Sequence, residues 1–159
     1  MAASHARGAM ADPEAMIAAG FGCRAGCKVE HVLQALAHSL EATGRSIEDV
    51  QALYTADFKG DEPGLMQAAQ QLGKALVPLE IETLKRHAQS ALTTSPRVLA
   101  RFGVPSVAET AALAGAFLHG TSARVRLLGP RHTWGDATCA LAIAEDGATR
   151  RPVVTEVGT

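Results

Sequence analysis

Along this chain, blocks in which hydrophobic residues recur at helical spacing are separated by short apolar runs. This pattern predicts helices separated by short strands. The clearest block covers residues 29–40, and Gly44 follows it where a helix commonly ends. Its apolar positions recur at helical spacing: Val29, Val32, Leu33, Leu36 and Leu40. Polar residues take the positions between them, so the block predicts an amphipathic helix with one buried face.

Start signals predict further helices. Pro63 suits the first turn of a helix over 63–72, and a Ser-Pro pair opens a short one over 95–102. Ser106 and Glu109 have the spacing of a capping box, in which the Glu side chain returns to the backbone amide of the Ser. An Ala-rich helix should follow as far as Leu118. Residues 46–49 and 80–89 predict shorter helical segments.

Short apolar runs between these helices predict strands. They cover residues 16–20, 52–56, 75–79, 124–128 and 137–144. Strands that alternate with helices indicate an α/β fold, here a three-layer α/β/α sandwich with a mixed, mostly parallel sheet of about five strands. The sheet should be mixed because the connection 129–136 is too short for a crossover helix. Pro78 predicts an edge position for the third strand.

Ligands of such sheets bind at the carboxyl ends of parallel strands. The loops 20–28, 55–63 and 129–136 are therefore the candidates for a ligand site.

Length and composition fit one soluble domain. The chain has 159 residues, 47% of them hydrophobic and 19% charged, with a formal net charge of -1. This balance argues against a nucleic-acid binder, and no apolar run is long enough for a membrane helix. Three cysteines suit a reducing cytoplasm. We expect residues 1–15 to be a disordered arm or an expression remnant, 16–145 the folded domain, and 146–159 a loosely ordered tail.

The first candidate loop is rich in glycine. From Gly20 to Ala25 it matches the letters G-x-G-x-x-A of a dinucleotide site, but the acidic residue Asp57 lies farther on than such a site requires. A nucleotide-dependent oxidoreductase is therefore the lesser alternative. More generally, glycines let backbone N–H groups approach an anion at a helix start, and Arg24 and Lys28 add positive charge there.

The cysteines and histidines do not have metal-site spacing. Cys23 and Cys27 are four residues apart, which is neither a redox motif nor half of a zinc site. Small buried cysteines are the favoured interpretation, and a reactive Cys23 at a helix start is the alternative. His31 and His38 lie about 10 Å apart by helix rise, too far to share a metal. We expect no metal and no cofactor.

The second candidate loop gathers polar groups after a buried strand. Thr55, Asp57, Lys59 and Glu62 place a hydroxyl, carboxylates and an ammonium within a few residues of one another. Acid–base chemistry is one interpretation. The other, favoured by spacing alone, is that the carboxylates cap the loop and the following helix while Lys59 pairs with one of them.

Three motifs together resemble the CobE family of cobalamin-biosynthesis proteins. In order along the chain they are Gly20-Phe-Gly-Cys-Arg-Ala-Gly-Cys27, then Thr55-Ala-Asp57-Phe-Lys59 with Glu62-Pro63-Gly64-Leu65, then Gly103-Val-Pro-Ser106-Val-Ala-Glu109. This family is similar to the C-terminal domain of CbiG, the cobalt-precorrin-5A hydrolase, and the resemblance covers residues 16–144. It implies a three-layer α/β/α fold and a place in corrin-ring synthesis.

The resemblance also implies a ligand. The chain would bind a corrinoid or precorrin intermediate as a carrier or accessory, with other corrin-pathway enzymes as further partners. The alternative is CbiG-like hydrolysis of a precorrin lactone with release of acetaldehyde, for which Asp57 and Glu62 are the candidate catalytic residues.

A corrinoid is an apolar disc fringed by carboxylates, so its site needs N–H donors, cations and an apolar wall. Phe21, Phe58 and Trp134 are the candidates for the wall. The candidate ligand-binding residues are Gly20, Phe21, Gly22, Cys23, Arg24, Lys28, Thr55, Asp57, Lys59, Ser106, Arg131 and His132.

Overall fold

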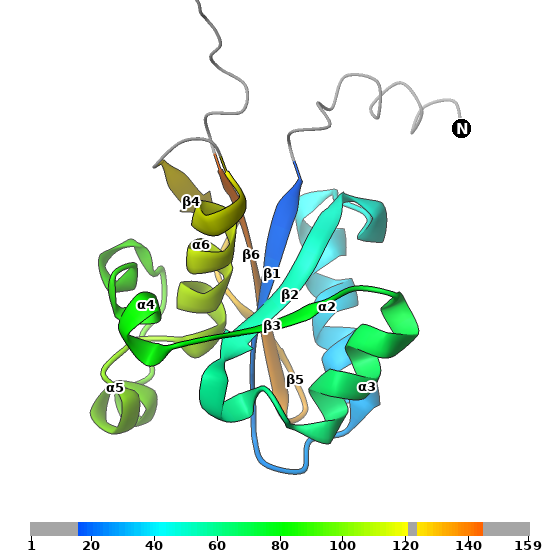
Figure 1. Ribbon diagram of the computed structural model, residues 1–159, viewed down its shortest axis with the longest axis horizontal. Helices are drawn as coiled ribbons and strands as arrows, with labels where there is room; N and C mark the ends of the chain where they lie inside the picture. The colour runs from blue at the N-terminus through cyan, green and yellow to red at the C-terminus, as the bar shows by residue number, and fades with distance from the viewer. Residues whose placement is uncertain (1–15, 121–123, 145–159) are drawn as a thin grey trace, which may run out of the picture.

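A computed structural model describes residues 16–120 and 124–144 (Figure 1). The strands are β1 (Ile17–Cys23), β2 (Val50–Ala56), β3 (Leu76–Leu79), β4 (Val125–Leu127), β5 (His132–Trp134) and β6 (Ala137–Ala144). The helices are α2 (Val29–Thr43), α3 (Pro63–Leu72), α4 (Ile81–Lys85), α5 (Pro96–Phe102) and α6 (Val107–His119). Single 3₁₀ turns are η2 (Ile47–Asp49), η3 (Asp57–Lys59) and η4 (Ala88–Ser90). The arm predicted at 1–15 and the tail predicted at 146–159 lie outside the described residues.

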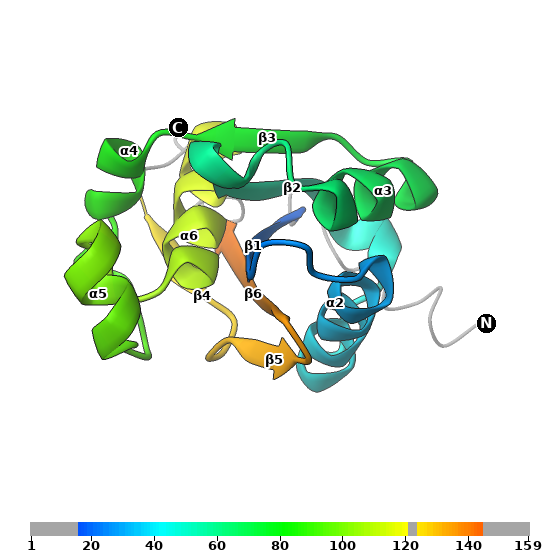
Figure 2. The same cartoon turned by 90° about the horizontal axis from the view of Figure 1, so that it is seen from below.

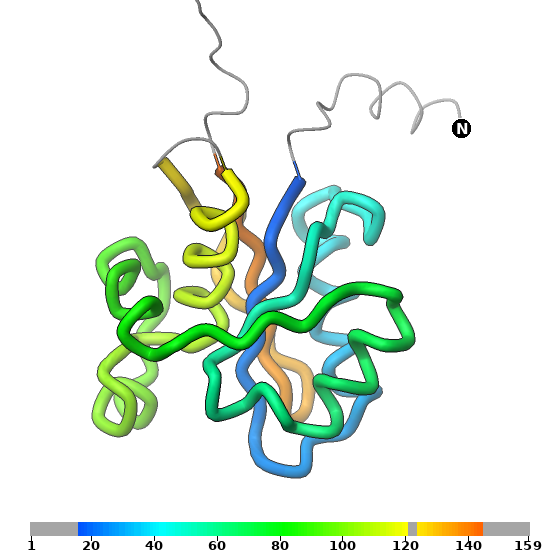
Figure 3. The backbone as a smooth tube through the Cα atoms, in the orientation of Figure 1, coloured from blue at the N-terminus to red at the C-terminus, as the bar shows by residue number. Residues whose placement is uncertain are grey.

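The described strands form one mixed sheet in the order β3-β2-β1-β6-β4, and β5 also pairs with β6. β1, β2 and β3 are parallel, whereas β6 is antiparallel to β1, β4 and β5. β3 lies at the edge, as Pro78 predicts. The first and last strands lie side by side, so the chain leaves the sheet close to where it enters (Figure 3).

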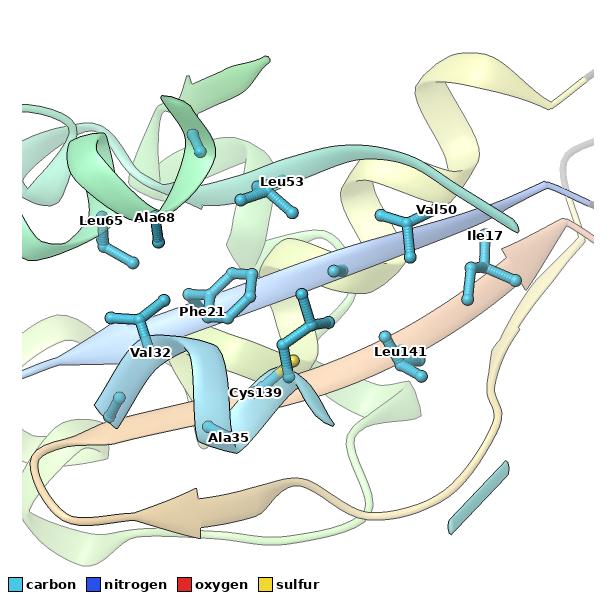
Figure 4. Close-up of a cluster of buried hydrophobic side chains, with 14 of the residues drawn as sticks. Ile17, Phe21, Val32, Ala35, Val50, Leu53, Leu65, Ala68, Cys139 and Leu141 are labelled. Carbon is cyan, nitrogen blue, oxygen red and sulfur yellow. The ribbon is translucent and has the colours of Figure 1, made fainter. Parts of the chain in front are cut away.

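Helices cover both faces of the sheet and complete the expected three layers (Figure 2). On one face, α2 and α3 pack on the sheet through a core that includes Phe21, Val32 and Leu65 (Figure 4). On the other face, the core under α4, α5 and α6 includes Tyr54 and Leu113. None of the described helices is both long and apolar enough to span a bilayer.

The Ala-rich helix α6 lies unusually close to the sheet. A Cβ on Gly20 would stand 2.1 Å from the carbonyl oxygen of Ala108 and 2.4 Å from the amide nitrogen of Ala112. A Cβ on Gly115 would stand 2.5 Å from the Tyr54 ring. Small side chains on both elements therefore set the distance between them.

Several boundaries differ from the pattern-based expectation; β2, for example, begins at Val50 rather than at Ala52. β1 continues past Gly20 to Cys23 because its last residues pair with β6, where Cys23 lies opposite Ala137. The connection 129–136, predicted as a loop, contains β5, which forms a hairpin with β6 around Gly135 at φ 59°. A three-residue strand is too short to show an alternation of its own.

Candidate functional site

Two loops meet at the carboxyl ends of β1 and β2, at the lower end of the molecule in Figure 1. The Gly26 N–H donates to the Glu62 carboxylate at 2.6 Å. A Cβ on Gly64 would stand 2.4 Å from the Cys27 carbonyl oxygen, so the start of α3 lies directly against the β1–α2 loop. The loop 24–28 and the segment 57–62 therefore form one continuous surface.

The β1–α2 loop is a tight turn. The Cys27 N–H donates to the Arg24 carbonyl at 3.0 Å, and Gly26 takes a left-handed conformation with φ 77°. The Arg24 N–H donates to the Asp136 carbonyl at 3.1 Å. The turn is thereby attached to the β5–β6 hairpin as well as to α3, while the Arg24 side chain is exposed.

Three cations lie on this surface. Arg24 and Lys28 are exposed and Lys59 is half-buried. In the part of the chain that the structure describes, none of these three side chains forms an ion pair. Lys59 does not pair with a neighbouring carboxylate as the favoured interpretation of its loop expected. The surface therefore presents positive charge that the fold does not use.

The two carboxylates of the second loop have different surroundings. Glu62 is buried, and its carboxylate accepts a hydrogen bond from the Gly26 N–H. Its side chain thus bonds the β1–α2 loop, whereas the structural interpretation expected it to cap its own loop and the following helix, where it forms no cap hydrogen bond. Asp57 is exposed at the start of η3, on the same edge as Arg24.

Burial raises the pKa of the thiols beside these loops. Cys27 is buried and Cys23 half-buried, and the loss of hydration raises the pKa of both, strongly for Cys23. A hydrogen bond with Cys27 raises the pKa of Cys23 further. The geometry therefore favours the structural interpretation of Cys23, because a protonated thiol reacts slowly.

Several candidate residues lie inside the fold rather than on this surface. Thr55 and Phe21 are fully buried, and the Thr55 hydroxyl donates to the Phe21 carbonyl at 2.8 Å. Gly20 and Gly22 lie within β1 and face α6 rather than forming a phosphate-binding turn, and the close approach of α6 requires a glycine at Gly20. This placement removes the basis of the dinucleotide alternative, which requires these glycines in the loop.

Ser106 and Glu109 confirm one half of the predicted capping box and contradict the other. The Ser106 hydroxyl accepts from the Glu109 N–H at 3.1 Å. The fully buried Glu109 carboxylate, however, accepts at 3.0 Å from each of three other backbone N–H groups, those of Leu92, Thr93 and Arg131. The carboxylate bonds these donors because two loops bring them together over the start of α6.

The last two basic candidates, Arg131 and His132, are adjacent in sequence, and the contacts described for them involve helices on different faces of the sheet. The Arg131 backbone is bonded to Glu109 of α6. The His132 Nδ1 lies 3.4 Å from the hydroxyl of Ser39, a buried residue of α2. The structure thus does not bring His132 together with Arg24, Lys28 and Lys59 by any contact it describes.

The three rings proposed as an apolar wall also separate. Phe21 is in the core, and the Trp134 ring lies 4.6 Å from that of His38 on α2. Phe58 instead stacks on Phe102 of α5, with ring centroids 4.5 Å apart and an interplanar angle of 20°. Sequence reasoning missed Phe102, since no local pattern links residues so far apart. Among the described residues, no cluster of three or more His, Cys, Asp or Glu side chains could hold a metal.

Known proteins resemble this chain over most of its length. The family model described as the C-terminus of cobalamin synthesis protein G matches residues 17–142. Protein CobE from Sinorhizobium sp is 30% identical over 97 residues, which are 61% of this chain and 63% of that protein. The match thus spans less than two thirds of the relative's length.

Solved structures of cobalamin-biosynthesis proteins also resemble this chain. CobE, a protein from the cobalamin (vitamin B12) biosynthetic pathway, has a TM-score of 0.76 and 39% identity over 80% of this chain and 89% of its own. The cobalamin biosynthesis protein chiG from Agrobacterium tumefaciens str. C58 has a TM-score of 0.63 and 36% identity over 82% of this chain and 100% of its own. A cobalamin biosynthesis protein G homologue from Sulfolobus solfataricus shares the fold, with a TM-score of 0.57 and 16% identity over 82% of this chain and 37% of its own. The chain therefore belongs to the family of cobalamin synthesis G C-terminal domains and is a protein of the cobalamin-biosynthesis pathway.

Proposed function

We propose that the protein binds a corrinoid or precorrin intermediate at the edge where β1 and β2 end, as a carrier or accessory in corrin-ring synthesis. The observation that carries the proposal is the set of cations Arg24, Lys28 and Lys59, which form no ion pair with any described residue, on two loops that the Glu62–Gly26 hydrogen bond joins. The enzymes that make and consume the intermediate would be its partners. We place this exchange in the cytoplasm, which suits the free thiols.

The chemistry of the ligand matches this surface. Corrin-ring intermediates carry acetate and propionate carboxylates around the macrocycle, and guanidinium and ammonium groups bond such carboxylates well. Each well-formed bond of this kind contributes about 1.5–3 kcal/mol. The N-terminus of α2, which no side chain caps, adds the positive end of a helix dipole beside Lys28.

The direct test is a binding titration with hydrogenobyrinic acid, a corrinoid that keeps its peripheral carboxylates, followed by visible absorbance. We expect Arg24→Ala and Lys59→Ala each to weaken binding about tenfold or more, and added salt to weaken it further. Lys74→Ala is the matched control, because Lys74 donates to the Val50 carbonyl at the opposite end of β2. Equal affinity of all four proteins would contradict a site at this edge.

Lactone hydrolysis is the second candidate, and the exposed Asp57 at the same edge favours it. Glu62 is a weaker candidate base, because its buried carboxylate already accepts a backbone N–H. Incubation with a precorrin-5-type substrate should release acetaldehyde if the protein is this hydrolase, and Asp57→Asn should abolish the release. Binding without release, in the wild type, would leave the carrier role alone.

A further inference from the structure

We propose that the outer face of Phe58, supported from behind by Phe102, is the apolar platform on which the flat macrocycle lies. This inference rests on the proposed function and names the part of the site that contacts the ring rather than its carboxylates.

Core packing does not explain the position of the Phe58 side chain. Its side chain is 42% exposed, and it belongs to neither hydrophobic core of the described fold. Phe102, by contrast, packs against the core under α6. The fold therefore fixes Phe102 in place, and the stacking of Phe58 on Phe102 holds the Phe58 ring in one orientation.

One cation directly adjoins this platform and a second lies beside its supporting ring, while the exposed Asp57 carboxylate precedes Phe58. Lys59 follows Phe58 directly in η3, and the Arg101 guanidinium carbon lies 5.2 Å from the centroid of the Phe102 ring. A flat apolar face with cations at its margin is complementary to a flat apolar ligand with carboxylates at its margin. This charge complementarity favours a carboxylated macrocycle over an uncharged apolar partner.

The other exposed aromatic side chains lack this combination. Trp134 contacts His38 on the α2 face of the sheet. Phe117 is 44% exposed near the C-terminal end of α6, where its ring lies 5.6 Å from that of His87. Because η3 directly follows β2, Phe58 is the exposed ring next to Lys59 among the described residues, whereas Trp134 lies on the β5–β6 hairpin that bonds Arg24.

The test compares Phe58→Ala with Phe117→Ala, two truncations of rings that are exposed to nearly the same extent and lie on different elements. In a titration with hydrogenobyrinic acid, we expect Phe58→Ala to weaken binding about tenfold and to reduce the shift of the bound pigment's visible bands. Phe117→Ala should bind as the wild type does. Phe58→Trp keeps a flat aromatic face and should restore both affinity and band shift.

The outcomes separate this inference from the function it rests on. Wild-type affinity in Phe58→Ala, together with weakened binding in Arg24→Ala, would overturn the platform and leave the corrinoid site standing. Absence of binding by the wild type would overturn both. Because Phe58 lies outside both cores, its truncation should lower the melting temperature by no more than the loss of one aromatic stack, and a loss of affinity in the folded variant then reports on the ligand contact.

Discussion

The Glu109 side chain connects two loops that lie over the start of α6. Its buried carboxylate accepts N–H groups from Leu92, Thr93 and Arg131, which belong to two separate loops. The Ser106 hydroxyl and the Glu109 backbone meanwhile fix the start of α6. A single side chain thus holds two loops and a helix start together, and the Arg131 loop depends on it.

Replacing Glu109 with Gln should destabilise the protein by about 1–3 kcal/mol. A Gln side chain can accept on one side only, so its amide NH₂ would face at least one of the backbone donors. Urea denaturation measures the change. Glu82→Gln is the control, because Glu82 forms an exposed pair with Lys85, and the loss of an exposed pair should cost less than about 1 kcal/mol. Equal effects of the two substitutions would show that Glu109 does not hold the loops.

For single residues, the sequence predicted the contacts between residues that are close in sequence. The bond between the Ser106 hydroxyl and the Glu109 N–H was predictable because the two residues lie within one helical turn. The partners of Glu109 were not, since they lie 16 or more residues away in sequence. Phe102 and the bond from Gly26 to Glu62 were missed for the same reason.

Among the elements, the close packing of α6 on β1 requires a glycine at Gly20. No Cβ fits at that position, because the backbone of Ala108 and Ala112 occupies the space. Gly22, two residues later on the same face of β1, has ordinary room: its Cβ would stand 3.7 Å from the Val107 side chain. The two glycines form a matched pair with opposite expectations.

Gly20→Ala should cost about 1–3 kcal/mol or more of the free energy of unfolding, because α6 must move away from the sheet. Gly22→Ala should change stability by less than about 1 kcal/mol. Thermal denaturation of both variants compares them directly. A tolerated Gly20→Ala would mean that α6 is not held at the distance the structure describes.

Helices were more predictable than strands for a physical reason. The stripe of α2 and the left-handed glycines Gly44 and Gly73 that end α2 and α3 are local signals, and the structure confirms them. The end of β1 and the existence of β5 depend instead on pairing with β6, which lies more than 100 residues after β1. Pairing of that kind leaves no local pattern.

For the molecule as a whole, burial of ionisable groups predicts a loss of stability at high pH. Burial raises the pKa of Cys139 to about 12 and that of Tyr54 to about 12, and it also raises the pKa of Cys23. In the unfolded chain these groups lose their protons from about pH 9 to 10, whereas in the folded protein they keep them. The folded state then binds more protons, so stability falls as the pH rises.

We therefore expect the free energy of unfolding to decrease from about pH 9 upward and to continue falling toward pH 12. Denaturation at a series of pH values measures it. Cys139→Ala should lower stability at neutral pH through the lost packing and yet reduce the alkaline slope, because one titrating group is gone. An unchanged slope in this variant would contradict the assigned pKa shift.

The described fold leaves one edge of the sheet, at the carboxyl ends of β1 and β2, with cations that no described residue neutralises and with an exposed aromatic ring. Family membership places the protein in cobalamin biosynthesis. The central claim joins these two findings: this edge binds the corrin macrocycle.

Gel filtration of the protein with hydrogenobyrinic acid, with the pigment's visible absorbance monitored, tests that claim most directly. We expect pigment to co-elute with the wild type at a constant ratio and much less of it to co-elute with Arg24→Ala. Pigment that elutes separately from the wild type, or equally well with Arg24→Ala, would contradict it.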